Sequence, residues 1–217
     1  MGKRIIMSEN MNYIQNRKYR PVCTIIIVIL NILAFAILEF MGDTEDVGFM
    51  VKYGAMYTPY LLERGEVYRL FSCIFLHFGI AHLLNNMICL VSFGYVIEKN
   101  LGLIRFLIIY IVAGIGGNLL SMYMELVSGS YSVSAGASGA IMGLAGALFL
   151  CVIVNKGRFG DFSLRSMLIF IALTIYSGYV NSDVDDMAHL GGLIIGFVVA
   201  GIVYGIPKLF KNRIKGQ

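Results

Sequence analysis

Long uncharged runs alternate with short charged segments along this chain. A helix that crosses a bilayer needs about 20 mainly apolar residues. One run, residues 126–155, is too long for a single helix, and the Ser and Gly content of its first part, Val127 to Ala137, favours a loop that leads into a helix. The pattern therefore predicts six membrane-spanning helices, over residues 21–41, 72–97, 104–125, 137–155, 164–180 and 187–206.

The composition agrees with a chain that is dissolved in lipid. Of the 217 residues, 58% are hydrophobic and 14% are charged, whereas soluble domains carry about 25% charged residues. The mean hydropathy of +0.79 over the whole chain is too high for one water-soluble core. The net charge of +4 is small and lies at the chain ends, which gives no support to nucleic-acid binding. We therefore expect an all-α, polytopic membrane protein.

The remaining segments are one long loop and two basic tails. Residues 42–69 carry acidic side chains and several tyrosines, which favour the headgroup level of a membrane. We expect a cytoplasmic tail over residues 1–20, a membrane domain over 21–206 and a second cytoplasmic tail over 207–217. The first apolar run follows a basic segment without a small-residue cleavage site, so we expect no signal peptide. The four cysteines form no CxxC pair, and we expect buried thiols.

Lys and Arg are distributed unequally between the two sides of the predicted bundle. The two tails and the turns after the second and fourth spans contain 14 of them, and the long loop contains three. Cytoplasmic segments of membrane proteins carry the excess of Lys and Arg. The bias predicts that both termini are cytoplasmic.

Two histidines and two asparagines, His77, His82, Asn85 and Asn86, interrupt the second predicted span. Polar residues in a bilayer are costly, so they are candidates for function. His82 and Asn86 are four residues apart and share one helix face, where they would either donate hydrogen bonds to an oxyanion or link helices to each other. His77 lies five residues before His82, about 140° around a helix. We expect His77 to be structural, near the outer end of the span.

The sequence Gly136-Ala137-Ser138-Gly139 begins the fourth predicted span. Flanking glycines leave space around the hydroxyl of Ser138, and a helix N-terminus offers free N–H groups and the positive end of the helix dipole. Ser138 is therefore a candidate nucleophile. A serine N-cap or a small-residue packing face is the alternative interpretation of the same residues.

His189 lies at the start of the sixth predicted span. An imidazole with a reference pKa of about 6.5 suits a general base, and a structural histidine is the alternative. Asp185 precedes His189 by four residues and would reach it only if the helix starts early. We interpret Asp185 as a solvated loop residue.

The fourth and sixth spans carry small residues at every fourth position, a pattern that allows helix backbones to approach closely. These residues are Gly139, Gly143 and Ala147 in one span and Ala188, Gly192, Gly196 and Ala200 in the other. The second, fourth and sixth spans all run inward from the outer side. We therefore expect Ser138, His189 and the pair of His82 and Asn86 to lie at one depth on one side of the membrane.

Four short stretches now resemble the motifs of the rhomboid intramembrane serine proteases. They are Tyr68-Arg69, His82-Leu83-Leu84-Asn85-Asn86, Gly136-Ala137-Ser138-Gly139 and Ala188-His189-Leu190-Gly191-Gly192. They are similar to the family's Trp-Arg, His-x-x-x-Asn, Gly-x-Ser-Gly and Ala-His-x-x-Gly motifs. Each stretch is short, but their order, their spacing and their placement on alternate spans are specific. The resemblance covers the chain from about Tyr68 to Gly196.

The resemblance implies a six-helix rhomboid-like bundle that acts as an intramembrane serine endopeptidase. Ser138 would be the nucleophile and His189 the general base, in a dyad that requires no aspartate. His82, Asn86 and the backbone N–H of Ser138 would bind the oxyanion. The structural and supporting residues would be Arg69, His77, Gly136, Gly139 and Gly192.

Two residues depart from the family pattern. Tyr68 replaces the tryptophan of the first loop, which is a mild aromatic change. Met142 stands where many members have a tyrosine that packs on the base, so the orientation of His189 would be looser. The resemblance also implies that the segment from Gly178 to Asp186 is a mobile cap over the site.

Other membrane functions fit the residues less well. A zinc protease would need His-Glu-x-x-His, an aspartyl protease would need paired aspartates within the spans, and a transporter would show ionisable residues in mid-span or an internal repeat. The sequence contains none of these patterns. The alternative that stays open is a catalytically silent rhomboid-like protein that binds or escorts membrane proteins.

The resemblance implies that no metal or cofactor takes part. The expected partners are single-pass transmembrane substrates and the lipid bilayer. We expect a multi-pass protein of the plasma (inner) membrane whose active site opens to the extracytoplasmic side. The sequence carries no signal for an oligomeric state.

Overall fold

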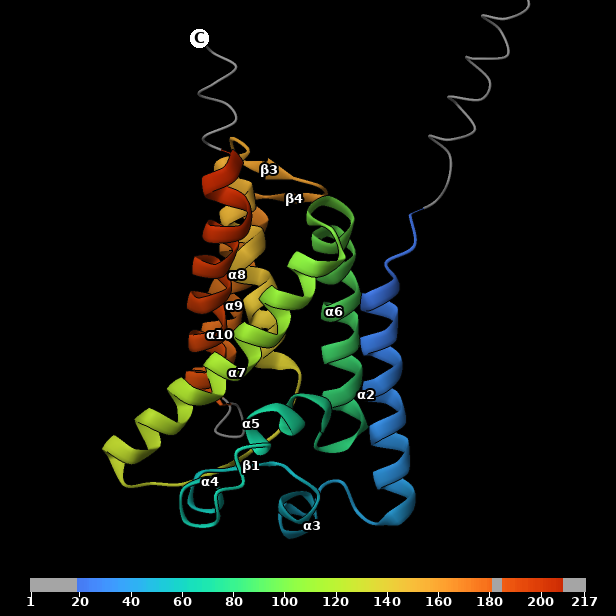
Figure 1. Cartoon of the computed structure of the whole chain (residues 1–217), viewed down its shortest axis with the longest axis vertical. Coiled ribbons are helices and arrows are strands. Elements are labelled where there is room, and N and C mark those ends of the chain that lie inside the picture. The colour runs from blue at the N-terminus through green and yellow to red at the C-terminus, as the bar shows by residue number, and fades with distance from the viewer. Residues whose placement is uncertain (1–18, 181–184, 209–217) are drawn as a thin grey trace, which may run out of the picture.

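The protein is a bundle of long apolar helices in a computed structural model that describes residues 19–180 and 185–208 (Figure 1). The helices of the bundle are α2 (Val22–Met41), α6 (Gly79–Leu101), α7 (Leu103–Ser128), α8 (Ser138–Val154), α9 (Leu164–Val180) and α10 (Asp186–Ala200), which continues as the π-helical turn η2 (Gly201–Gly205). This architecture confirms the expected all-α, polytopic membrane protein.

Four helical segments of the described residues are long and apolar enough to cross a membrane. They are Val22–Met41, Gly79–Leu101, Leu103–Ser128 and Asp186–Lys208. The helical segments Ser138–Val154 and Leu164–Gly178 are apolar but shorter. The multi-pass topology therefore agrees with the sequence, and the count of six complete spans stays a prediction.

The connection between α2 and α6 contains several short elements. They are α3 (Val47–Lys52), β1 (Met56–Tyr57), α4 (Thr58–Arg64), α5 (Arg69–Ser72) and the 3₁₀ turn η1 (Cys73–Phe75). Strand β1 pairs antiparallel with β2 (Val133–Ser134), just before α8, and a second small hairpin joins β3 (Arg158–Phe159) to β4 (Phe162–Ser163) between α8 and α9. All of the short elements before α6 lie at one end of the bundle (Figure 1).

The second predicted span was wrong at its start. It was expected to begin at residue 72, but α6 begins at Gly79, because Leu76 and Phe78 have extended backbones and Gly79 has φ +69°. A Cβ on Gly79 would lie 2.7 Å from a carboxylate oxygen of Glu45, so a side chain here would also crowd the loop. Hydropathy does not detect this break, because the residues on both sides of it are apolar.

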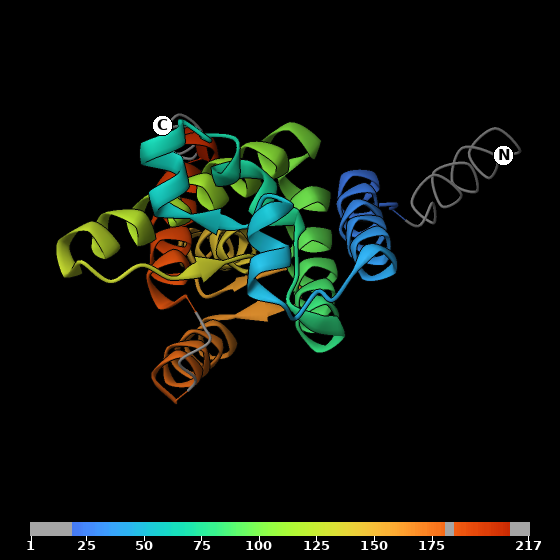
Figure 2. The ribbon, with the colours of Figure 1, turned by 90° about the horizontal axis from the view of Figure 1, so that it is seen from below.

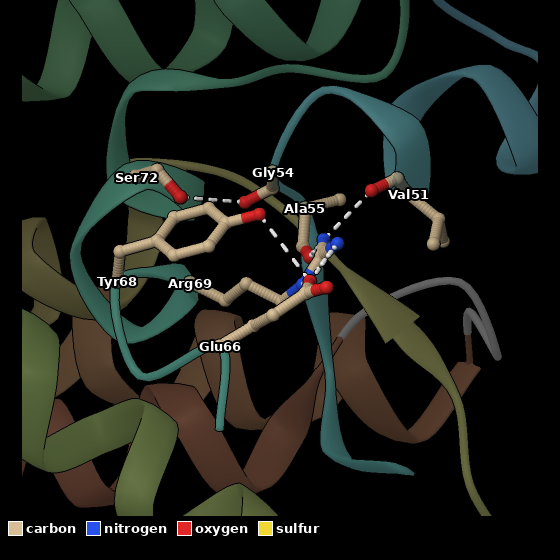
Figure 3. A network of polar contacts seen from close by, with 7 residues as sticks. All are labelled: Val51, Gly54, Ala55, Glu66, Tyr68, Arg69 and Ser72. Carbon is tan, nitrogen blue, oxygen red and sulfur yellow. Dashed lines mark hydrogen bonds and ion pairs between the residues drawn. The ribbon is translucent and has the colours of Figure 1, made fainter. Parts of the chain in front are cut away.

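Arg69 organises the connection between α2 and α6 through its guanidinium. The residue is only 3% exposed. One terminal nitrogen donates to the carbonyl oxygens of Val51 and Ala55, both at 2.7 Å, and Nε donates to Glu66 at 2.6 Å (Figure 3). A buried charge is tolerated when it is paired and hydrogen-bonded in this way. The side chain therefore joins α3, the residue before β1 and α5 into one unit.

Glu98 links the other end of α6 to the start of α2. Its carboxylate is buried and accepts hydrogen bonds from the backbone N–H groups of Cys23, at 3.0 Å, and Thr24, at 2.8 Å, and from the Thr24 hydroxyl at 2.8 Å. The first N–H groups of a helix have no partner within the helix. The Glu98 carboxylate supplies that partner to α2 from a neighbouring helix.

Helices α8 and α10 pack with their backbones in contact. A Cβ added to Gly192 would fall on the carbonyl oxygen of Gly139, and a Cβ added to Gly196 would fall on the backbone of Gly143. The predicted four-residue stripes of small residues are confirmed as the surfaces through which these two helices meet. Figure 2 shows α8 in the interior of the bundle, with α2 and α9 at its periphery.

Replacing Gly196 by alanine tests this contact. The methyl group would occupy the position of the Gly143 backbone, and overpacking typically costs about 1–3 kcal/mol. We expect Gly196→Ala to lower the thermal unfolding midpoint of the purified protein in detergent micelles by several degrees. The matched control is Gly201→Ala, whose Cβ would lie at an ordinary 3.9 Å from Leu150. Equal midpoints for the two variants would contradict the packing described here.

Candidate active site

Helices α6, α8 and α10 begin at the same end of the bundle as the loop elements (Figure 1). The residues that the sequence singled out for chemistry lie near the starts of these helices: His77 just before α6, His82 in its first turn and Asn86 one turn further along, Ser138 at the start of α8, and His189 in the first turn of α10. The three helices therefore start at the same end of the bundle, and a common depth of these residues in the membrane stays a prediction.

Ser138 is the first residue of α8 and is half-buried. The backbone just before it is fixed by two hydrogen bonds to the segment that precedes α6. Gly136 N–H donates to the carbonyl oxygen of Cys73 at 2.9 Å, and Ala137 N–H lies 3.4 Å from Nε2 of His77. The serine hydroxyl therefore stands at a helix start whose position is set by tertiary contacts.

Gly136 allows an imidazole to lie against the serine loop. Its φ is +148°, and a Cβ at this position would lie 2.9 Å from Cε1 of His82, 3.0 Å from Nε2 of His82 and 3.5 Å from Oγ of Ser138. The His82 ring and the Ser138 hydroxyl thus flank one point in space. A side chain on residue 136 would fill that point.

Asn86 lies one turn further along α6, and its side chain is buried. Its amide nitrogen donates to the carbonyl oxygen of His82 at 3.1 Å, within the same helix. An amide NH₂ has two hydrogens. Within the described residues, this bond uses one of the two hydrogens, and the other is available to another acceptor.

His77 lies in the connection before α6, not on the helix, so the predicted 140° relation to His82 within one helix is wrong. The extended residues Leu76 and Phe78 break the helix there. The rings of His77 and His82 instead pack edge to face, with centroids 5.2 Å apart. Burial, and secondarily His82, lower the pKa of His77 to about 3. The ring is therefore neutral, as it must be for Nε2 to accept from Ala137 N–H.

His189 lies in the first turn of α10 and is half-buried. Next to it, the carbonyl oxygen of Ala188 lies 3.4 Å from the position that a Cβ on Gly139 would take. Ala188, which precedes the candidate base, thus contacts Gly139, which follows the candidate nucleophile. Within the described residues, Nδ1 of His189 is buried without a hydrogen-bond partner, and no hydrogen bond joins the imidazole to Ser138. Such bonds are often long in unliganded enzymes and tighten with substrate.

Asp185 is not a solvated loop residue, as its position in the sequence suggested. It is the N-cap of α10 and accepts a hydrogen bond from Ala188 N–H at 2.9 Å. The hydroxyl of Ser121 on α7 lies 2.8 Å from each of its carboxylate oxygens, which share the single hydroxyl hydrogen. The carboxylate is therefore held by two helices.

Two polar residues of α7 were missed by the sequence analysis. They are Ser121 and Asn118, whose amide donates to the carbonyl oxygen of Leu70 and to Sγ of Cys73, both at 2.9 Å. Neither residue belongs to a short motif. The signal that would have identified them is their polarity within an apolar run, which was followed only in the second, fourth and sixth spans.

The other residues that the sequence analysis named lie at three places. Gly139 and Gly192 form the α8–α10 contact, Arg69 holds the loop, and Met142 is buried one turn after Ser138. The proposed cap lies partly in residues 181–184, outside the described residues. Its first residues, from Gly178 to Val180, belong to helix α9 and are not a loop.

Comparison with known proteins now adds to this geometry. The family model for the Rhomboid domain matches residues 64–206. The chain is 38% identical over 189 residues to the rhomboid protease GluP of Bacillus subtilis, which covers 87% of this chain and 36% of that protein. It is 36% identical over 155 residues to RHOMBOID-like protein 1 of Arabidopsis thaliana, covering 70% of this chain and 38% of that protein.

A third relative is shorter. The putative rhomboid protease YdcA of Bacillus subtilis is 35% identical over 136 residues, which cover 63% of this chain and 67% of that protein. The chain spans little more than a third of the length of GluP and of RHOMBOID-like protein 1. The domain match covers most of the membrane bundle and every candidate site residue. The chain belongs to the rhomboid family of membrane proteins.

Proposed function

We propose that this protein is an intramembrane serine endopeptidase that cuts single-pass membrane proteins in or near their transmembrane segments. Ser138 is the proposed nucleophile and His189 the proposed general base. The observation that supports this most is the meeting of the starts of α8 and α10, where the backbone beside Ser138 contacts the backbone beside His189. Family membership and the names of the protease relatives support the same reaction class.

The proposed reaction is acyl transfer. His189 takes the proton of the Ser138 hydroxyl while Oγ attacks the carbonyl carbon of the scissile peptide bond. The imidazolium then gives this proton to the leaving amine, and the peptide bond breaks. Water attacks the acyl-enzyme with His189 as base, which releases the second product and restores the serine.

The oxyanion of the tetrahedral intermediate needs donors that are already in position. The proposed donors are the His82 ring, the free amide hydrogen of Asn86 and the backbone N–H of Ser138, which has no partner within α8 because it belongs to the first turn. The His82 ring already lies beside the serine loop at Gly136. Arg69, His77, Gly136, Gly139 and Gly192 support the site through the contacts described above, and no metal or cofactor enters the proposal.

We propose a location in the plasma (inner) membrane, with both termini cytoplasmic and the site open to the extracytoplasmic side. The Lys and Arg bias supports this orientation. The start of α2 and the end of α10 lie at the end of the bundle opposite to the starts of α6, α8 and α10 (Figure 1). Water and substrate would then reach the site from outside.

The variants Ser138→Ala and His189→Ala test the dyad. Each removes a group that forms or breaks a bond, and we expect each to lower kcat by about four orders of magnitude or more. The assay is cleavage of a single-pass model substrate by the purified protein in lipid vesicles, together with labelling by a fluorophosphonate. We expect the label on the wild type and not on Ser138→Ala.

Cleavage by either variant at the wild-type rate would refute the dyad. A label retained by Ser138→Ala would point to another nucleophile. A folded wild type that binds single-pass proteins but neither cuts them nor takes the label would favour the escort function over the protease.

The oxyanion donors are tested by His82→Ala and Asn86→Ala. Removal of one preorganised donor typically lowers kcat by about 10²–10³-fold, and we expect losses of this size with little change in KM. Asn85→Ala is the matched control, since Asn85 is the adjacent asparagine on α6 and is exposed. Activities of His82→Ala and Asn86→Ala close to that of Asn85→Ala would exclude these two side chains as donors.

Reporter fusions test the orientation. A cytoplasmic reporter, active only in the cytosol, should be active when fused after Gln217 and inactive when inserted at Gly65, where a side chain would meet no neighbour within 4 Å. The Lys and Arg distribution is the physical reason for this expectation. The opposite pattern would place the site on the cytoplasmic side.

A further inference from the structure

We propose that Asp185, held by Ser121, is a positioning residue that fixes the start of α10 and thereby the place of the His189 imidazole opposite Ser138. This inference rests on the proposed function, because it assigns a role relative to the proposed base. In this proposal Asp185 takes no proton from the imidazole. It acts through the helix on which the imidazole stands.

The Asp185 carboxylate makes contacts with two helices. It accepts from the backbone N–H of Ala188 at 2.9 Å, and so caps α10. Its two oxygens share the single hydrogen of the Ser121 hydroxyl of α7, which lies 2.8 Å from each. In addition, the backbone carbonyl of Asp185 accepts from the N–H of His189 at 3.1 Å. One residue therefore joins the first turn of α10 to α7.

The backbones of α7 and α10 also approach each other closely beside this carboxylate. A Cβ on Gly117 would lie 2.5 Å from the carbonyl oxygen of Ala188 and 3.2 Å from the nitrogen of Gly192. Ser121 follows Gly117 by four residues and so lies on the same face of α7, one turn nearer to the end of that helix. The backbones of α7 and α10 thus touch at Gly117, and one turn further along α7 Ser121 binds Asp185 at the start of α10.

His189 depends on the helix start more than an interior residue would. The first turn of a helix has N–H groups without intrahelical partners and frays most easily. Within the described residues, Nδ1 of His189 has no hydrogen-bond partner that would orient the ring. The capped first turn and the packing around it are therefore what hold the imidazole, and loss of the cap would let it move relative to Ser138.

The test compares variants of the full-length protein in lipid vesicles. Asp185→Ala removes the cap and the link to α7, whereas Asp185→Asn keeps an oxygen that accepts from Ala188 N–H and from Ser121. Ser121→Ala removes only the link. Asp46→Ala is the matched control, because the Asp46 side chain caps α3 in the same way, by accepting from Phe49 N–H.

Two readouts separate positioning from general destabilisation. The first is kcat and KM for the single-pass model substrate. The kcat is calculated per mole of protein that the fluorophosphonate labels when the labelling reaction is complete. The second is hydrogen–deuterium exchange of the peptide that contains the first turns of α10, which needs no activity.

We expect Asp185→Ala to lower kcat per labelled site by about 10–100-fold, the scale of an ångström-sized misplacement, with KM changed little. Asp185→Asn should recover most of this loss, and Ser121→Ala should fall between them. Ser121→Ala combined with Asp185→Ala should be no worse than Asp185→Ala alone, because the two side chains form one unit. Exchange at the start of α10 should rise in Asp185→Ala and not in Asp185→Asn or Asp46→Ala.

The proposal is overturned if Asp185→Ala keeps the wild-type kcat, if Asp46→Ala loses as much, or if exchange at the start of α10 is unchanged. These outcomes differ from failure of the proposed function. That failure would appear as cleavage or labelling that survives in Ser138→Ala, or as an inactive wild type. If the wild type is inactive, hydrogen–deuterium exchange still gives an answer. Unchanged exchange at the start of α10 in Asp185→Ala would overturn the positioning role, whereas raised exchange would support only the part of the proposal in which Asp185 fixes the start of α10.

Discussion

The backbone contact between α8 and α10 is the constraint on which the rest of the bundle depends. Glycines remove the side chains that would hold these helices apart, so their backbones meet from their first turns onward. Close-packed surfaces of this kind do not slide past each other without clashes. The relative height of the two helix starts is therefore fixed. The proposed dyad of Ser138 and His189 needs that property more than any other, because the two residues come from separate helices.

The sequence predicted most of the fold because hydropathy, charge and small-residue spacing are local signals. Apolar runs located the helices, and the four-residue stripes identified the α8–α10 surface. The start of α6 could not be predicted in this way. Cys73 to Phe78 is as apolar as the helix that follows it, and the break depends on backbone conformations and on a loop carboxylate that packs against Gly79.

The polar contacts that hold the site were less predictable, because each joins residues far apart in the chain. Glu98 ended an apolar run in the sequence, yet it is buried and caps α2. Asp185 resembled a loop residue until its partner, Ser121 on α7, was known. The motifs located the candidate nucleophile, base and oxyanion donors. Their supports, such as Asn118 and Ser121, carry no motif and emerge only from the tertiary structure.

The most direct test of the central claim is an experimental structure of the protein in lipid after reaction with a fluorophosphonate. The account predicts phosphorus bonded to Oγ of Ser138, with the His189 imidazole within hydrogen-bond reach of the adduct and the glycine contact between α8 and α10 intact. An adduct on another residue, or an imidazole separated from Ser138 by an intervening side chain, would contradict it.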